Sequence, residues 1–249
     1  MRPIERGISP QAQDYKNYRD AFPHLVSRLG MYCTYCERRI PTNLAVEHIQ
    51  PKGLPQYAAL IGRWDNFVLG CVNCNGTKTN KDVVLAHVLL PDRDNTAAAF
   101  IYTPDGKVAP APGLTAAQHQ MAVDTLALCG LDKRPSQVTD ENGQIVAIDR
   151  YAQRLEVWAV ALTSKKDLAD TPTAGMRRQI VKAARAEGFF SIWMQVFDDD
   201  AQMRQMLIDG FSEGTTFIGF AGTAQKCFDA KTRPVTPRPP NGLAHGSKI

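Results

Sequence analysis

Long apolar runs are missing from this chain of 249 residues, and none approaches the eighteen residues of a membrane-spanning helix. The first six residues are polar, so the chain does not begin like a signal peptide. No internal repeat is visible. From these absences we expect a cytoplasmic protein that has no membrane partner.

An excess of one charge is also missing over most of the chain. The formal net charge is +4, and residues 226–249 alone carry five basic residues against one acidic residue. The rest of the sequence is therefore balanced. Bulk charge gives no argument for a nucleic-acid partner, so such a partner must be inferred from a site.

Cysteines, by contrast, form a clear pattern. Four of the six make two Cys-x-x-Cys pairs, Cys33 with Cys36 and Cys71 with Cys74. In a chain without a secretory signal, such pairs indicate metal ligands or redox centres before disulfides. Two thiolate turns complete one tetrahedral zinc site, which would be structural because no position is left for a substrate. Redox pairs and four unrelated buried thiols are the alternatives.

Apolar periodicity and turn residues divide the chain near residue 112. Before that point they predict helices over 10–30 and 74–85, strands over 44–49 and 66–70, and a hairpin over 100–108. Beyond it they predict helices over 115–129, 148–163, 172–187, 189–197 and 201–211. The zinc would therefore clamp both ends of a strand, loop and strand insert.

Inside this insert lie residue types that suit phosphodiester hydrolysis. Glu47 and His48 close the first predicted strand, Asn66 opens the second, and Asn75 follows the last cysteine. An imidazole suits a general base, and the oxygens of Glu47 and Asn75 suit Mg²⁺ or Mn²⁺. Adjacent strand residues point to opposite faces, so Glu47 and His48 converge only if the strand ends or twists there. Lys78, one helical turn after Asn75, is expected to contact a phosphate.

These residues, in this order, resemble the HNH nuclease family. The matching segments are 32–36, 46–52, 64–69 and 71–78. The resemblance implies a ββα unit that holds one divalent metal, with His48 as general base and Glu47 and Asn75 as ligands. It also implies that Asn66 holds the loop between the strands by hydrogen bonds. Glu47 replaces the Asp of many members, and Asn75 the His of the family's name.

The expected fold is α+β, with a ββα-metal domain, a zinc clamp and a mostly helical C-terminal domain. The expected divisions are a helical lead-in over 1–30, the HNH domain over 31–112, the helical domain over 113–230 and a flexible tail over 231–249. The tail prediction rests on its prolines and glycines.

The expected function is metal-dependent hydrolysis of DNA, with RNA not excluded. The first six residues and segment 33–40 also resemble small stand-alone HNH proteins of bacterial anti-phage defence, Septu-like and retron-associated, which work beside an ATPase. That resemblance implies a partner ATPase. The alternative is a non-catalytic subunit, stabilised by zinc, that binds nucleic acid or docks a partner.

Three further features have simpler interpretations. The polar run over 91–96 could brace the site or bind phosphate, and an ordinary solvated turn explains it equally well. The acidic run over 198–200 favours a helix start. Trp158 and Trp193 are expected in the core.

Overall fold

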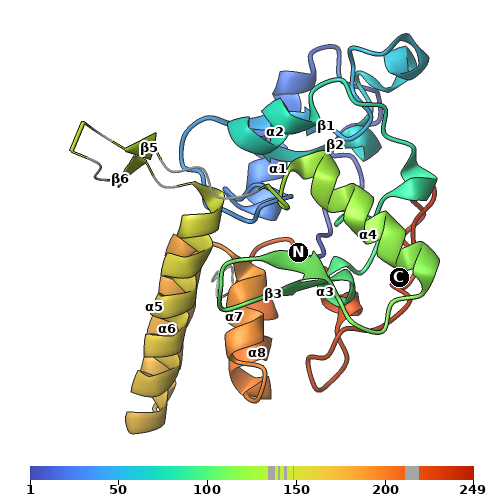
Figure 1. Ribbon diagram of the computed structural model, residues 1–249. Coiled ribbons are helices and arrows are strands. Elements are labelled where there is room, and N and C mark those ends of the chain that lie inside the picture. Colours follow the sequence, from blue (N-terminus) through green and yellow to red (C-terminus); the bar gives the residue numbers. More distant parts are fainter. Residues whose placement is uncertain (134–137, 140, 143–144, 148, 211–218) are drawn as a thin grey trace.

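The chain is described by a computed structural model. It describes residues 1–133, 138–139, 141–142, 145–147, 149–210 and 219–249. An antiparallel hairpin of β1 (Leu44–His48) and β2 (Phe67–Cys71) leads directly into α2 (Val72–Lys78), and α1 (Phe22–Leu29) packs against it (Figure 1). The mixture of helices and strands confirms the predicted α+β class.

The hairpin forms because β2 is buried along its whole length, while β1 buries four of its five residues. Its register pairs His48 with Phe67, and β1 ends at His48. The following helix differs from the predicted range of 74–85. It begins at Val72, because the second cysteine pair makes its first turn, and it stops before Thr79, whose φ is 47°.

The predicted helix over 10–30 is helical only in its second half. A 3₁₀ turn, η1 (Tyr18–Ala21), runs into α1, and Gly30 ends the helix with a φ of 74°. Residues 10–17 are not helical. Within that stretch Tyr15 is buried against the rings of Trp64 and Phe67, so its apolar side chain serves the core without a helix.

Short elements connect the ββα unit to the rest of the chain. They are η2 (Pro55–Leu60), η3 (Trp64–Asn66), η4 (Leu85–His87), α3 (Thr96–Ala99) and the hairpin of β3 (Phe100–Tyr102) with β4 (Val108–Pro110). The last of these confirms the predicted hairpin.

The C-terminal part is mostly helical, as predicted. It contains α4 (Ala116–Cys129), α5 (Arg150–Asp170), α6 (Ala174–Glu187), α7 (Phe190–Val196), α8 (Ala201–Ile208), η5 (Gln225–Cys227) and a small pair of strands, β5 (Val138–Thr139) and β6 (Ile145–Ala147). Thr115 caps α4 with a capping box, and Asp200 caps α8, which confirms the helix start predicted for the acidic run. Part of the predicted helix over 201–211 lies outside the described residues.

Residues 231–249 are packed, so the prediction of a flexible tail is wrong. The Arg238 side chain is 2% exposed and donates to the backbone oxygens of Ile4, at 2.9 Å, and Pro91, at 2.8 Å. Ile249 is buried, and its carbonyl accepts from the amide of Asn95. Composition misled here because Ile4, Pro91 and Asn95, which bind Arg238 and Ile249, lie more than a hundred residues earlier.

One continuous apolar core joins the two halves of the molecule. It includes Phe67 of β2, Leu126 of α4 and Trp158 and Trp193 of α5 and α7, and both tryptophans are buried as predicted. The predicted boundary near residue 112 therefore has core residues on both sides. Among the described residues, no helix is long and apolar enough to cross a membrane.

Candidate active site and metal centre

The two cysteine pairs come together at the junction of β2, α2 and the turn that follows residue 32. The Sγ atoms of Cys33, Cys36, Cys71 and Cys74 all lie within 4.8 Å of one another, and all four residues are buried. Around a tetrahedral zinc, with Zn–S bonds of about 2.3 Å, neighbouring sulfurs are about 3.8 Å apart. The Cys36–Cys71 distance of 3.7 Å fits this value. The four thiols are therefore compatible with one structural zinc.

Two arginines face this thiol cluster. Arg150, at the start of α5, donates to Cys74 Sγ at 3.1 Å and to the carbonyl of Cys129 at 3.0 Å. Arg38 donates to Cys71 Sγ at 3.6 Å. Four thiolates around one Zn²⁺ leave a net charge of −2, so these guanidinium groups would neutralise the excess. The sequence pattern gave no sign of either arginine.

Beside the thiol cluster, a pocket of about 510 Å³ opens over the end of β1 and the start of η1. Glu47, His48, Asn75 and Lys78 all line it. Because β1 ends at His48, the adjacent Glu47 and His48 reach the same pocket despite the alternation of a strand. The fold thus brings Glu47, His48, Asn75 and Lys78 together at one pocket, whereas Asn66 does not line it.

His48 is held on three sides. Its Nε2 lies 3.0 Å from the carbonyl of Ile61, and its ring packs edge to face with Tyr18 and Phe67. A carbonyl only accepts, so Nε2 carries the proton and Nδ1 is left as the basic nitrogen. Burial lowers the pKa of His48 below its usual value. The imidazole is therefore neutral at neutral pH, the form that a general base requires.

Lys78 lies in a different place from the one predicted. Its side chain is 1% exposed, and its Nζ lies 2.9 Å from Glu47 Oε1 and 2.8 Å from the carbonyl of His48. An ammonium buried in this way is paired within the protein and does not meet a phosphate. We predicted from the sequence that Lys78 contacts the substrate, whereas in this structure its ammonium is paired with Glu47 and the carbonyl of His48.

Glu47 is buried and is the ion-pair partner of Lys78. Burial raises the pKa of its carboxyl group, although Lys78 works in the opposite direction. Oε1 has an ion-pair partner but no aligned hydrogen bond among the described residues. The carboxylate of Glu47 and the amide oxygen of Asn75, which also lines the pocket, are hard oxygen donors of the kind that Mg²⁺ and Mn²⁺ prefer.

Asn66 is buried and fastens the loop that precedes β2. Its Oδ1 accepts from the amide of Gln50 at 2.8 Å, and its Nδ2 donates to the carbonyls of Gln50, at 3.0 Å, and Leu60, at 3.3 Å. All of these partners are backbone groups. The side chain therefore ties the chain after β1 to the chain before β2, next to Ile61, which holds His48.

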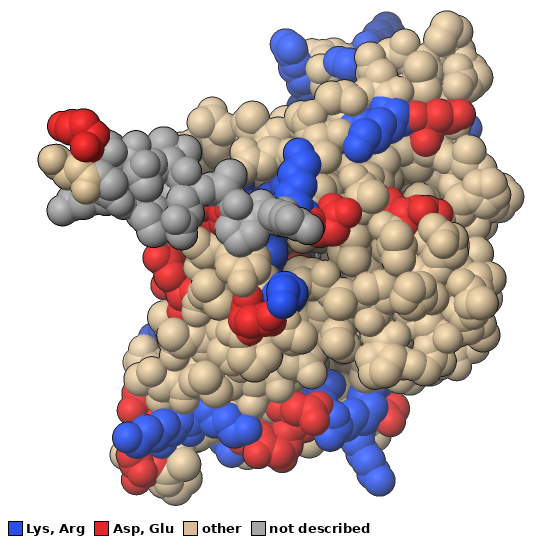
Figure 2. All heavy atoms as spheres, viewed as in Figure 1, with Lys and Arg blue, Asp and Glu red and all other residues tan. Residues whose placement is uncertain are grey.

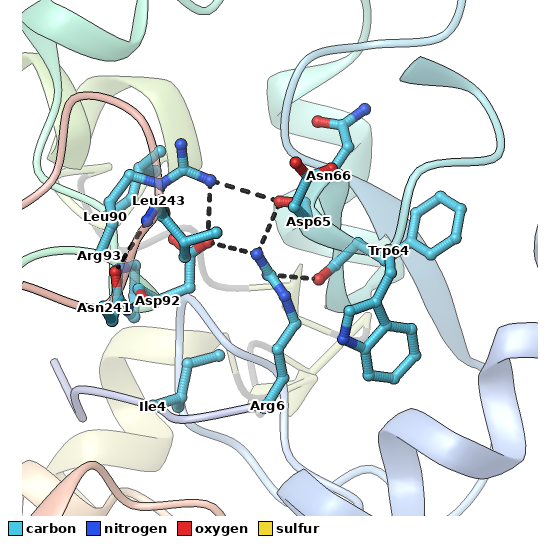
Figure 3. A network of polar contacts seen from close by, with 12 residues as sticks. Ile4, Arg6, Trp64, Asp65, Asn66, Leu90, Asp92, Arg93, Asn241 and Leu243 are labelled. Carbon is cyan, nitrogen blue, oxygen red and sulfur yellow. Dashed lines mark hydrogen bonds and ion pairs between the residues drawn. The ribbon is translucent and has the colours of Figure 1, made fainter. Parts of the chain in front are cut away.

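A buried network of charges contacts the backbone of the two residues that flank Asn66 (Figure 3). Arg6 donates to the carbonyls of Phe67, at 2.7 Å, and Asp65, at 2.6 Å, and pairs with Asp92 at 3.0 Å. Arg93 pairs with Asp92 at 2.9 Å and donates to the carbonyl of Ala244. The network thus fixes the backbone on both sides of Asn66. Of the three interpretations of the polar run over 91–96, bracing the site agrees with this structure.

Comparison with known families agrees with this geometry. Residues 33–81 match the HNH endonuclease family model. The match covers both cysteine pairs, the ββα unit and all four predicted hydrolytic residues. No curated protein matches the chain. The HNH domain indicates a nuclease that binds nucleic acid and uses a divalent metal.

Several residues that shape the site escaped sequence reasoning. Tyr18 and Arg6 lie upstream of the HNH segment, Arg150 lies far downstream, and Ile61 acts through its backbone carbonyl. Only Phe67 had a signal, because it is the cross-strand partner of His48 once the two strands are paired.

Proposed function

We propose that the chain is a metal-dependent endonuclease that hydrolyses phosphodiester bonds of DNA. The observation that carries the proposal is the convergence of Glu47, His48 and Asn75 on one pocket beside a thiol cluster suited to zinc. A non-catalytic binding module has no need of a neutral histidine aligned by a carbonyl next to two oxygen donors.

Each side chain has a distinct task in this proposal. Nδ1 of His48 accepts the proton of the attacking water, while Nε2–H, held by Ile61, keeps the ring in place. Glu47 and Asn75 would hold Mg²⁺ or Mn²⁺, which when bound neutralises charge on the phosphate and the leaving oxygen. Asn66 keeps the loop closed.

Mg²⁺-dependent nicking of a supercoiled plasmid tests the proposal. General-base catalysis contributes about 10²–10⁴-fold, so His48→Ala should lower the rate by that factor. His48→Gln, which keeps an N–H donor for Ile61, should be equally inactive and should fold normally. Asn75→Ala should be partly rescued by extra metal. His87→Ala, an exposed histidine of η4, is the matched control and should cleave normally.

The wild-type rate should rise with pH, because only the deprotonated imidazole accepts a proton. Since burial lowers the pKa of His48, the midpoint should lie below the ordinary value of about 6.5. Nicking by His48→Ala at the wild-type rate would contradict the mechanism. DNA binding without any nicking by the wild type would favour the non-catalytic alternative.

We propose further that this nuclease is a cytoplasmic effector of bacterial anti-phage defence and works with an ATPase. The support is the resemblance of the first six residues and of segment 33–40 to small HNH proteins of such systems. Protection of a bacterial host against phage, lost in His48→Ala and dependent on the partner ATPase, is the expected result.

A further inference from the structure

The pocket of the HNH domain has more cations than anions. Its charged lining residues are Arg19, Lys52 and Lys78 against Glu47, and Lys78 is already paired with Glu47. Arg19 and Lys52 are exposed, and neither has a carboxylate within ion-pair distance in the described part of the chain. Unpaired cations in a cleft concentrate anions there. Most of the chain is electrically balanced, so this local excess marks the pocket as a place for an anion.

Lys52 is held in position without being neutralised. Its Nζ donates to the hydroxyl of Tyr18 at 2.7 Å and lies 4.1 Å from the centroid of the Tyr18 ring. An ammonium has three N–H donors, and the hydroxyl takes only one of them. A neutral phenol leaves the whole positive charge of Lys52 available to a ligand.

Tyr18 connects this lysine to the hydrolytic residues. Its ring lies edge to face against the His48 ring, with centroids 4.8 Å apart. Asn17 caps the short helix η1 that carries Tyr18, and η1 packs on β1. One aromatic side chain from outside residues 33–81 therefore touches both the proposed base and the unpaired cation.

We propose that Tyr18 and Lys52 form a phosphate-binding arm of the pocket, in which Lys52 contacts a phosphate of the bound nucleic-acid strand. Tyr18 is the positioning residue, because it fixes the ammonium beside His48. Arg19, whose guanidinium lies 5.8 Å from the same ring, extends the cationic surface. In this proposal Lys52 makes the phosphate contact that we predicted for Lys78 from the sequence. This inference rests on the proposed function for the identity of the anion.

Fluorescence anisotropy with a labelled DNA duplex tests the arm in the zinc-loaded full chain. Magnesium is omitted so that binding is measured without cleavage. Lys52→Met should weaken binding roughly 3–10-fold and reduce the slope of log affinity against log salt by about one phosphate contact. Lys16→Met is the matched control, because Lys16 is exposed two residues before Tyr18 but does not line the pocket.

Two further variants separate the roles of the pair. Lys52→Arg keeps the charge and should keep the wild-type salt slope. Tyr18→Phe keeps the ring against His48 but removes the hydroxyl, so binding should weaken while the slope stays within about 0.3 of the wild-type value. In cleavage assays Lys52→Met should raise KM more than it lowers kcat.

The outcomes distinguish the arm from the nuclease function. Equal affinity and equal salt slope for Lys52→Met and Lys16→Met would overturn the arm, as would a wild type that binds no DNA. A reduced slope for Lys52→Met together with a wild type that never nicks DNA would support the arm and refute the proposed catalysis. Thermal unfolding of each variant verifies that it is folded.

Discussion

The thiol cluster and the buried charge network hold two sides of the same ββα unit by opposite means. The thiol cluster uses four like side chains in two local pairs, a set of ligands suited to a cation taken from solution. The charge network joins Arg6, Asp92 and Arg93 with backbone carbonyls, and its cations are side chains of the protein itself. The first region should therefore depend on metal supply, whereas the second should depend on the integrity of distant segments.

Removing the metal should have the largest effect. Structural zinc contributes on the order of 10 kcal/mol in small domains, so Cys71→Ser should unfold residues 31–95. The measurements are bound zinc by elemental analysis and limited proteolysis. Cys227→Ser replaces a buried cysteine outside the cluster and should keep its zinc. A Cys71→Ser protein with no zinc and an unchanged melting temperature would refute the clamp.

Breaking the charge network should lower the unfolding free energy less than removing the zinc does, but more than breaking an exposed ion pair. Asp92→Asn leaves Arg6 and Arg93 buried without their carboxylate, and loss of one partner of a buried pair costs about 3–5 kcal/mol of unfolding free energy. Urea denaturation gives the value. Asp199→Asn, which breaks an exposed pair with Lys165, should leave the unfolding free energy unchanged. Zinc content should stay at one per chain in both variants.

Acid distinguishes the same two regions. Burial tends to raise the pKa of Asp92, but Arg6 and Arg93 outweigh it and hold that pKa below its usual value. A depressed pKa in the folded state stabilises the protein above the unfolded pKa of about 3.9, and this contribution is lost as the pH falls through the folded value. Protons displace zinc from thiolates at a higher pH than the one at which Asp92 is protonated. As the pH falls, zinc should therefore leave before the charge network is lost. Loss of both in a single step would contradict this separation.

The smallest predicted effect concerns the arginines at the thiol cluster. Arg150→Met removes the donor to Cys74, and loss of such a contact outside the metal ligands typically lowers metal affinity about 10–100-fold. Zinc transfer to a chromophoric chelator should accelerate accordingly. Arg38→Met should have less effect because its contact is longer. Lys166→Met, an exposed change on the same helix α5, should transfer zinc at the wild-type rate.

The comparison also explains what the sequence could predict. The Cys-x-x-Cys spacing and the residues between the pairs predicted the ββα unit, the thiol cluster and the residues of the pocket, because these lie close together along the chain. Lys78 was misplaced because spacing shows that it is near Asn75 but not that Glu47 buries its charge. The charge network and the packing of residues 231–249 combine segments far apart in sequence, and no local pattern encodes them.

The space-filling view shows the surface that results. Basic side chains gather at the upper edge, over the region of the ββα unit, and a second mixed group of acidic and basic side chains lies at the opposite end (Figure 2). Exposed pairs of opposite charge also occur away from the ββα unit, such as Lys165 of α5 with Asp199. Lys52 and Arg19, which line the pocket, have no carboxylate within ion-pair distance among the residues that the structure describes.

Arg150 connects the thiol cluster to a long helix of the C-terminal part. The residue begins α5, a helix of 21 residues that packs on α6 and α7 and extends away from the body of the molecule (Figure 1). At 1.5 Å per residue the helix is about 30 Å long, so a tilt of about 5° at Arg150 displaces its far end by about 3 Å. The first residue of this helix is hydrogen-bonded to a sulfur of the thiol cluster. A pair of spin labels, one near Asp170 and one on the ββα unit, would test whether occupancy of the thiol cluster changes the tilt of α5.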